Sequence, residues 1–317
     1  MSSSSPVRVA VLDDYQNVAL DLADWSPLKN RAEITVFNDH LADSAKVIER
    51  LKPFDVVCVM RERTPLTREI IESLPDLKLI ASTGAGNASI DLDAAAERNI
   101  KVVHTGYSST PTIEFTWALI LAMARNISPE NRSLREGGWQ QMIGTQLAGK
   151  TLGLLGLGHI GSAVGVIGRA FRMNVIAWSQ NLTAERAESK GVQLVDKDTL
   201  FSTSDFLSIH LRLGERTRGL VGAAELAKMK RTARIVNTSR GPIIDTAALL
   251  GALESGQIAG AAIDVYDTEP LELASPLRKL DNVLATPHIG YVSRELYQTF
   301  YGDTVRNIVE WLDQQPS

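Results

Sequence analysis

The stretch that decides the fold is Gly156-Leu157-Gly158-His159-Ile160-Gly161. It follows a short apolar run, 151–155, that is typical of a strand. Apolar residues at helical spacing follow it between 160 and 171, and a second apolar run occupies 174–178. A strand, a glycine-rich turn, a helix and a strand within about 30 residues form a βαβ unit. This unit is the setting in which such a glycine pattern binds a dinucleotide.

Each glycine of this pattern has a physical reason. The first permits a tight turn, the second lets the backbone approach a pyrophosphate, and the third lets the helix pack closely on the strand. The start of the helix offers unpaired N–H groups and the positive end of its dipole to the phosphates. We therefore predict that the cofactor contacts Gly156, Gly158, His159, Ile160 and Gly161.

Composition excludes several classes of protein. The chain has 317 residues, of which 44% are hydrophobic, and 33 basic against 37 acidic residues give a net charge of −4. Its length favours two domains, and the absence of a basic stripe argues against a nucleic-acid partner. The serine-rich start, 1–6, lacks the apolar stretch of a secretory signal, and no run approaches ~18 apolar residues. We expect a soluble, cytoplasmic protein with no membrane partner. The only cysteine, Cys58, lies in an apolar run and is expected to be a buried strand residue.

Strand-like and helix-like runs alternate twice along the chain, which predicts an α/β fold with two parallel sheets. In the first hundred residues the expected helices are 16–25, 42–52, 67–74 and 91–98, and the expected strands are 7–12, 33–37, 55–60, 78–82 and 100–103. After 151–155 the expected strands are 174–178, 193–195, 205–211, 234–237, 261–265 and 283–286. A helix at 245–254 has Asp245 as its N-cap and Gly256 at its end. We predict two doubly wound domains with a cleft between them.

Two further helices bear on how the domains are organised. The helix at 112–126 is apolar on nearly every face, so one sheet cannot account for all of its burial. It is expected to lie between domains, in a subunit interface, or in both, which favours a homodimer. The helix at 293–314 is amphipathic and is expected to return to the first domain. The predicted domains are therefore 1–104 plus 291–317, which binds substrate, and 105–290, which binds the nucleotide.

Three polar segments follow predicted strands of the second sheet. They are Val236–Pro242, Asp264–Pro270 and Thr286–Gly290. Ligands of open parallel sheets bind outside the carboxyl ends of the strands, so Arg240, Glu269 and His288 are expected to converge beside a bound nucleotide. A cation, a carboxylate and an imidazole suit carbonyl–alcohol redox chemistry. That chemistry needs a proton donor for the alkoxide and a positive group to polarise the carbonyl.

At these residues the chain resembles the D-isomer-specific 2-hydroxyacid dehydrogenases. The resemblance runs from Arg61-Glu62-Arg63-Thr64 through Thr83-Gly84-Ala85-Gly86 and the glycine-rich turn to Thr286-Pro287-His288-Ile289-Gly290. Four ordered motifs that match together are more specific than any one alone. The resemblance implies a flavodoxin-like substrate domain and a Rossmann nucleotide-binding domain.

The resemblance also implies roles for individual residues. His288 is the general acid in reduction and the general base in oxidation, while Glu269 binds the other imidazole nitrogen and favours the protonated ring. Arg240 holds the substrate carboxylate with a planar fork of donors. The expected substrate contacts besides Arg240 are Arg61 and the backbone of Ala85 and Gly86. The expected cofactor contacts besides the glycine-rich turn are Ser179, Gln180, Leu211, Thr238, Ser239, Asp264 and Gly290. No metal is implied.

The sequence departs from the family pattern at two positions near the cofactor. The acid that binds the ribose 2′-hydroxyl of NAD should fall at position 179, which is Ser179. Without that carboxylate a 2′-phosphate is not repelled, so the sequence favours NADP and leaves NAD open. Arg212 stands where the family usually has proline, and it can either bind a phosphate or lie in solvent.

We therefore expect reversible hydride transfer between NAD(P)H and a small 2-keto acid or D-2-hydroxy acid. Two alternatives remain open from the sequence. One is a non-enzymatic, NAD(H)-sensing regulator of the corepressor type. The other is a formate dehydrogenase, which the Glu269–His288 pair disfavours because formate oxidation requires no proton transfer.

Overall fold

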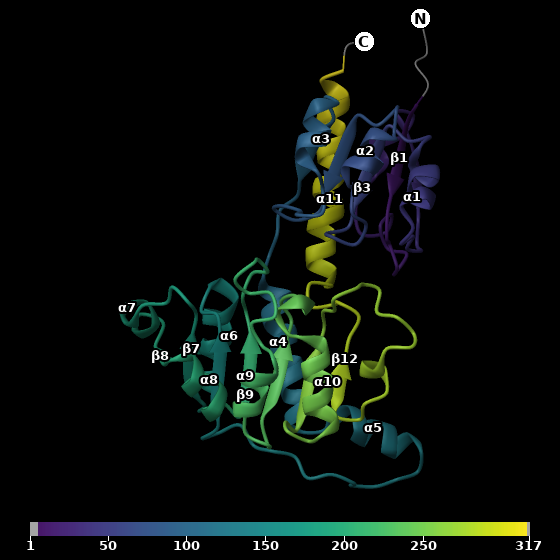
Figure 1. Ribbon diagram of the computed structural model, residues 1–317. Coiled ribbons are helices and arrows are strands. Elements are labelled where there is room, and N and C mark those ends of the chain that lie inside the picture. Colours follow the sequence, from purple (N-terminus) through teal and green to yellow (C-terminus); the bar gives the residue numbers. More distant parts are fainter. Residues whose placement is uncertain (1–5, 316–317) are drawn as a thin grey trace, which may run out of the picture. The chain divides into compact units, whose positions relative to one another are not determined.

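A computed structural model describes residues 6–315, and the serine-rich residues 1–5 lie outside that range. The chain forms two compact units (Figure 1). Unit 1 consists of the chain up to Ser108 together with the segment that starts at Val292, and unit 2 runs from Ser109 to Tyr291. Within the described residues, no helix is long and apolar enough to cross a membrane.

Unit 1 is a parallel sheet of five strands in the order β2-β1-β3-β4-β5. This is the flavodoxin-like order, in which the strand order reverses between β1 and β3. The strands are β1 (Val7–Val11), β2 (Ala32–Val36), β3 (Val56–Val59), β4 (Leu79–Ser82) and β5 (Lys101–His104). The helices are α1 (Ser44–Leu51), α2 (Arg68–Glu72), α3 (Leu92–Glu97) and α11 (Arg294–Asp313), with a 3₁₀ turn at Ser26–Leu28.

The C-terminal helix α11 (yellow in Figure 1) belongs to unit 1, although the residues that precede it in the sequence, up to Tyr291, belong to unit 2. It packs against β4, and Phe300 and Ile308 on its apolar face are fully buried. Tyr297 of α11 accepts a hydrogen bond of 3.1 Å from Arg63, which follows β3. Unit 1 is therefore built from both ends of the chain.

One predicted helix, at 16–25, is wrong, because this segment forms turns. Asn17 has a left-handed φ of 53°, which interrupts helical geometry. The carboxylate of Asp14 accepts from the Ala19 amide at 2.8 Å, and the Trp25 indole donates to the Ala19 carbonyl at 2.9 Å. These local bonds replace those that a helix would make.

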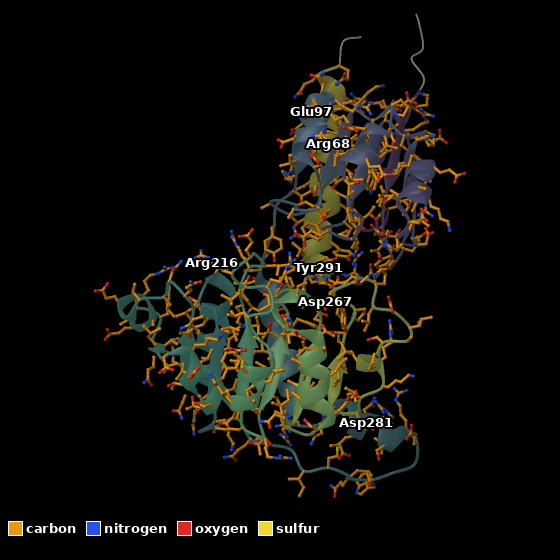
Figure 2. The ribbon with its side chains drawn as sticks, viewed as in Figure 1. Arg68, Glu97, Arg216, Asp267, Asp281 and Tyr291 are labelled. Atoms are coloured by element: carbon orange, nitrogen blue, oxygen red, sulfur yellow. The ribbon has the colours of Figure 1, made fainter. Side chains whose placement is uncertain are left out.

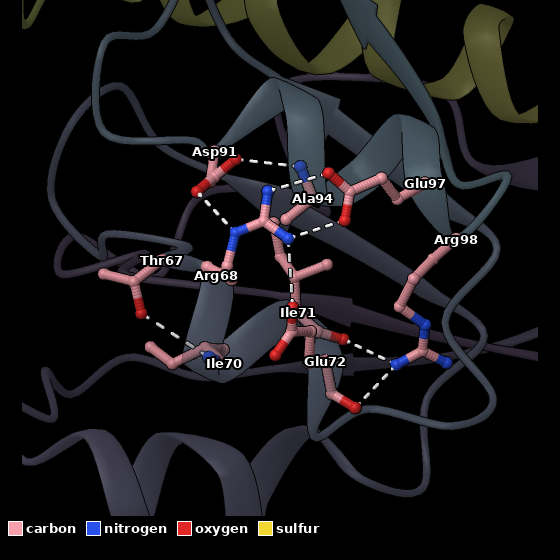
Figure 3. A network of polar contacts seen from close by, with 9 residues as sticks. All are labelled: Thr67, Arg68, Ile70, Ile71, Glu72, Asp91, Ala94, Glu97 and Arg98. Carbon is pink, nitrogen blue, oxygen red and sulfur yellow. Dashed lines mark hydrogen bonds and ion pairs between the residues drawn. The ribbon is translucent and has the colours of Figure 1, made fainter.

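Helices α2 and α3 of unit 1 are joined by a network of charged groups (Figure 3). Arg68 donates to both carboxylate oxygens of Glu97, at 2.6 and 3.0 Å, and also pairs with Glu72 and Asp91. The hydrogen bond from Arg68 lowers the pKa of the Glu97 carboxyl. The Arg68 guanidinium thus pairs with carboxylates of both helices and holds the two helices together.

Unit 2 is a parallel sheet of seven strands in the order β12-β11-β10-β9-β6-β7-β8. The strand order reverses between β6 and β9, as in a Rossmann fold. The strands are β6 (Thr151–Leu155), β7 (Asn174–Trp178), β8 (Gln193–Leu194), β9 (Phe206–Ile209), β10 (Arg234–Asn237), β11 (Gly260–Ile263) and β12 (Val283–Ala285). The helices are α4 (Thr110–Ala124), α5 (Ile127–Arg135), α6 (His159–Ala170), α7 (Ala184–Glu188), α8 (Lys197–Thr203), α9 (Ala223–Lys228) and α10 (Thr246–Glu254). The predicted fold class, two doubly wound parallel sheets, is confirmed.

Both faces of the unit 2 sheet are covered, so most residues of its strands are apolar. Successive residues of β10 point to opposite faces: Ile235 belongs to the apolar cluster with α8, α9 and α10, and Val236 to the cluster with α4 and α6. Asp245 caps α10 by accepting from the Ala248 amide at 2.9 Å, as the sequence predicts.

Helix α6 lies very close to β6 because glycines face the strand. A Cβ at Gly161 would lie 2.2 Å from the Gly156 carbonyl oxygen, closer than real side-chain contacts. Since that neighbour is backbone, a side chain at Gly161 can be accommodated only if the turn or the helix moves. The glycine pattern is thus a packing requirement of the fold.

We predict that Gly161→Ala lowers the free energy of unfolding by about 1–3 kcal/mol, as expected for overpacking. Gly251→Ala in α10 is the matched control, because a Cβ there would meet nothing within 4 Å. Alanine in a helix interior is expected to raise stability by about 0.5–1 kcal/mol. Urea unfolding measures both variants, and equal effects of the two substitutions would contradict the packing argument.

Candidate active site

The candidate site of unit 2 lies at the edge where its parallel strands end. Because all seven strands run in one direction, the loops after them emerge together. Figure 2 labels Arg216, Asp267 and Tyr291 along this edge, and Asp281, which precedes β12, at the opposite edge. The predicted cofactor and catalytic residues of unit 2 all follow strand ends or begin α6.

The glycine-rich turn forms an open cradle at this edge. Gly156 has a left-handed φ of 104°, and a Cβ there would lie 2.6 Å from the His210 carbonyl oxygen. Gly158 is the N-cap of α6, and a Cβ there would meet nothing within 4 Å. The backbone around Gly158 is therefore open to a ligand, and the N-terminus of α6 favours an anionic one. These residues fit the pyrophosphate of a dinucleotide.

His288 and Glu269 form a direct pair. Nδ1 of His288 lies 2.5 Å from Oε2 of Glu269, and Oε1 of Glu269 accepts from the Tyr266 amide at 2.9 Å. Within residues 6–315, Nε2 of His288 has no hydrogen-bond partner. Both side chains are partly exposed, at 29% and 34%. The carboxylate thus fixes the orientation of the ring and presents Nε2 outward.

The loop that carries His288 is held by the buried carboxylate of Asp264. Oδ1 of Asp264 accepts from the Thr286 hydroxyl at 2.6 Å and from the Ile289 amide at 2.9 Å. Oδ2 accepts from the Gly290 amide at 2.8 Å. Burial raises the pKa of Asp264, while these hydrogen bonds oppose that shift. The carboxylate therefore ties the end of β11 to the loop after β12, where His288 adopts a left-handed φ of 52°.

The loops that carry Arg240 and Glu269 are in direct contact. A Cβ at Gly241 would lie 2.1 Å from the Tyr266 carbonyl carbon, so only glycine fits between the two loops. The Asn237 side chain donates to the Arg240 carbonyl at 2.9 Å and accepts from the Ser239 amide at 3.0 Å. Arg240 itself donates to the Ser239 carbonyl at 2.8 Å. The structure thus brings the segments of all three predicted catalytic residues to one part of the edge.

The remaining predicted cofactor residues of unit 2 lie around the same edge. Thr238 is hydrogen bonded to Thr116 of α4 at 2.9 Å, and the Ser239 hydroxyl donates to the Leu211 carbonyl. Ser179 and Gln180 directly follow β7, whose last carbonyl, at Trp178, accepts from the Gly156 amide at 2.9 Å. Their contact with a cofactor stays a prediction.

Sequence reasoning missed several residues that shape the site. Tyr291 packs edge-on against the His288 ring, with 5.6 Å between centroids. The Tyr266 hydroxyl lies 3.0 and 2.9 Å from the carbonyl oxygens of Ile263 and Thr286, between two strand ends. Thr116 reaches Thr238 from α4. Thr112 and Thr116, four residues apart in a mostly apolar helix, are the one signal in the sequence.

His210 and Cys58 have no catalytic environment. His210 follows β9 with Nε2 2.9 Å from the Ser208 hydroxyl, and burial lowers its pKa to about 4. Its imidazole is therefore neutral at pH 7. Cys58 is buried in β3, where burial raises the pKa of its thiol to about 12. The sequence-based expectation of a structural cysteine agrees with this position.

The predicted substrate residues of unit 1 lie at the carboxyl ends of β3 and β4. Arg61 has a left-handed φ of 53°, and its guanidinium donates to the Thr83 carbonyl at 3.1 Å. It lies over Gly84, where a Cβ would be 1.7 Å from Nη1. Ala85 and Gly86 are exposed. Arg61 and these backbone groups are therefore neighbours within unit 1.

Comparisons with known proteins agree with this fold. The model of the D-isomer specific 2-hydroxyacid dehydrogenase NAD binding domain matches residues 117–290. A hydroxypyruvate reductase of Thermotoga maritima is 40% identical over 286 residues, which cover 89% of this chain and 92% of that protein. A D-3-phosphoglycerate dehydrogenase of Archaeoglobus fulgidus is 41% identical over 292 residues, or 91% of this chain, which spans about half (54%) of that protein.

Among solved structures, a putative D-3-phosphoglycerate dehydrogenase oxidoreductase from Ralstonia solanacearum superposes with a TM-score of 0.93. The two sequences are 38% identical, and the matched region covers 97% of this chain and 94% of that chain. The chain belongs to the D-isomer-specific 2-hydroxyacid dehydrogenase family, as its motifs predict.

We predict that His210 makes stability depend on pH. Its pKa of about 4 in the folded protein lies below the ordinary 6.5, so between pH 6.5 and 4 the unfolded chain binds a proton that the folded chain does not. The free energy of unfolding should therefore fall as the pH is lowered through this range. His210→Gln is expected to remove about 1–3 kcal/mol of that fall, since one pKa unit corresponds to 1.36 kcal/mol.

Urea unfolding at pH 7 and pH 4.5 measures this effect. His104→Gln in unit 1 is the control, since His104 is exposed at the end of β5. An unchanged pH dependence in His210→Gln would contradict the assignment of His210 as a neutral, buried group.

Proposed function

We propose that the protein is an oxidoreductase that reversibly transfers a hydride between a nicotinamide cofactor and a small 2-keto acid or D-2-hydroxy acid. The single observation that carries the proposal is the His288–Glu269 pair of 2.5 Å, with Nε2 of His288 unpaired within the described chain. This pair lies at the same sheet edge as Arg240 and the open glycine cradle. An acid–base group, a cation and a dinucleotide cradle are what carbonyl reduction requires.

The residues of this chain would act as follows. When bound, the nicotinamide cofactor supplies or accepts the hydride at the carbonyl carbon of the substrate. Protonated His288 donates the Nε2 proton to the oxygen that becomes the hydroxyl, and it takes that proton back in oxidation. The Glu269 carboxylate stabilises the imidazolium and keeps Nε2 oriented. Arg240 binds the substrate carboxylate and polarises the carbonyl.

Substrate contacts from unit 1 are part of the proposal. We propose that Arg61 and the exposed backbone of Ala85 and Gly86 bind the substrate carboxylate. Relatives with the names hydroxypyruvate reductase and glyoxylate reductase, at 40% and 37% identity, support small 2-keto acids as the substrate class. Neither a formate dehydrogenase nor a non-enzymatic regulator is supported by these relatives.

We propose NADPH as the preferred cofactor. An acid after β7 would repel a 2′-phosphate, and this chain has Ser179 and Gln180 there instead. Both side chains are neutral and can donate hydrogen bonds to a phosphate oxygen. The preference for NADPH depends on a few residues around the adenosine ribose, whereas membership of the family does not depend on these residues.

The test of the proposed activity is oxidation of NADPH and NADH with glyoxylate, hydroxypyruvate and pyruvate. We expect turnover of at least one acid, with NADPH preferred. Arg240→Lys should lower kcat/KM about 100-fold or more, because an ammonium cannot reproduce the planar fork. No turnover with any acid and either cofactor would contradict the proposal.

Glu269→Gln tests the role of the pair separately. Without the carboxylate the imidazolium is less stable, so the rate of reduction should fall by about 10²–10⁴-fold near neutral pH. An unchanged rate of reduction would show that Glu269 does not act on His288.

We also propose that the protein forms a homodimer through unit 2. Large apolar side chains are exposed on α5 and on the extended segment after it, which Figure 1 shows in teal below the sheet. They are Ile127, Leu134, Trp139, Met142 and Ile143, exposed by 50–95%. A contiguous stretch of such residues is typical of an interface, and a second copy would cover it.

Trp139→Glu with Ile143→Glu should convert the dimer to a monomer, as measured by sedimentation velocity. The matched control is Leu273→Glu, since Leu273 is 88% exposed in a different loop of unit 2. A monomeric wild type, or a dimer unaffected by the double substitution, would contradict this interface.

A further inference from the structure

The loop after β9 carries three arginines that the proposed reaction does not use. Arg212, Arg216 and Arg218 fall within seven residues, together with one acid, Glu215. All three arginines are exposed, and in the described part of the chain none has a hydrogen-bond or ion-pair partner. Arg68 of unit 1, by contrast, is bonded to several carboxylates (Figure 3). The loop therefore holds cationic groups available to an anion.

The start of this loop lies against the glycine-rich turn. A Cβ at Gly156 would be 2.6 Å from the His210 carbonyl oxygen and 3.0 Å from Cδ2 of Leu211. The Gly156 amide also donates a hydrogen bond of 2.9 Å to the carbonyl of Trp178, the last residue of β7. Ser179 and Arg212 thus follow strands that flank β6, and the ends of β7 and β9 are separated by two strand spacings, about 10 Å.

The backbone of the loop is fixed, whereas its arginine side chains project into solvent. The Ser239 hydroxyl donates to the Leu211 carbonyl, and the Thr217 hydroxyl donates to the Arg212 carbonyl at 2.7 Å. The Gly219 amide donates to the Pro242 carbonyl at 2.8 Å. These bonds hold the arginines at the sheet edge before any ligand binds, which lowers the entropic cost of binding.

We infer that Arg212 binds the 2′-phosphate of the cofactor's adenosine ribose, with Ser179 and Gln180 as neutral donors on the opposite side. This inference rests on one premise of the proposed function, namely that a nicotinamide dinucleotide binds at the glycine-rich turn. In this fold, the residue that contacts the 2′ position of the ribose usually follows the strand that corresponds to β7. Here the first basic residue after β7 is Arg186, which lies in α7. The segment directly after β7 therefore offers no cation to a 2′-phosphate. Arg212 supplies one from the loop after β9 instead, and the parallel N–H donors of its guanidinium can bind two phosphate oxygens at once. Arg216 and Arg218 add to the positive potential.

The test uses binding without turnover, by isothermal titration calorimetry with 2′,5′-ADP and 5′-AMP. We expect the wild type to bind 2′,5′-ADP at least ten times more tightly than 5′-AMP. Arg212→Gln should weaken binding of 2′,5′-ADP about 10–100-fold and change binding of 5′-AMP less than twofold. Arg212→Lys should retain part of the preference.

Arg231→Gln is the matched control, because Arg231 is also exposed but precedes β10 at the opposite edge of the same sheet. It removes the same charge and should leave both affinities unchanged. Equal effects of Arg212→Gln and Arg231→Gln, or a wild type without preference for 2′,5′-ADP, would overturn the inference.

Two further outcomes separate this inference from its alternatives. If Arg212→Gln leaves binding of 2′,5′-ADP unchanged but weakens binding of 3-phosphoglycerate, the loop serves a phosphorylated substrate and the inference is wrong. If no 2-keto acid is reduced but the 2′,5′-ADP preference depends on Arg212, the proposed reaction fails while the inference stands. If neither nucleotide binds and no 2-keto acid is reduced, both are wrong.

Discussion

The geometry of the candidate site depends on the buried carboxylate of Asp264. Its two oxygens accept three hydrogen bonds from the loop after β12, including the amides on the C-terminal side of His288. A buried carboxylate without partners would be very costly, so the loop and the carboxylate stabilise each other. The position of His288 in the chain's fold therefore depends on the hydrogen bonds between its loop and the buried carboxylate of Asp264, rather than on the contacts of the histidine side chain itself.

The rest of the site follows from close approaches between strand ends. Gly241 lets the loop of Arg240 touch the backbone of Tyr266, whose amide in turn holds Glu269. Gly156 lets the segment at His210 lie over the glycine-rich turn. Side chains at either glycine would separate these loops. The same parallel sheet that buries its apolar strands thus assembles polar groups that are up to about 130 residues apart in sequence.

Much of this arrangement could be predicted from the sequence, because its signals are local. The glycine spacing and apolar runs predict the βαβ unit, and the strand-end motifs predict that Arg240, Glu269 and His288 share one edge. The predicted helix at 16–25 is wrong because the bonds of Asp14 and Trp25 to the backbone depend on tertiary position. The hydrogen bonds of Asp264 to the loop after β12 were missed for the same reason. Contacts between loops that follow different strands leave no periodic pattern in the sequence.

The most direct measurement for the central claim is the fate of a labelled hydride. The protein would be incubated with NADPH deuterated at C4 of the nicotinamide and with glyoxylate or another 2-keto acid that it reduces. Direct transfer beside His288 predicts one deuterium at C2 of the hydroxy acid, observed by mass spectrometry and NMR, from one of the two C4 positions only. A product that contains solvent hydrogen at C2 would contradict the account.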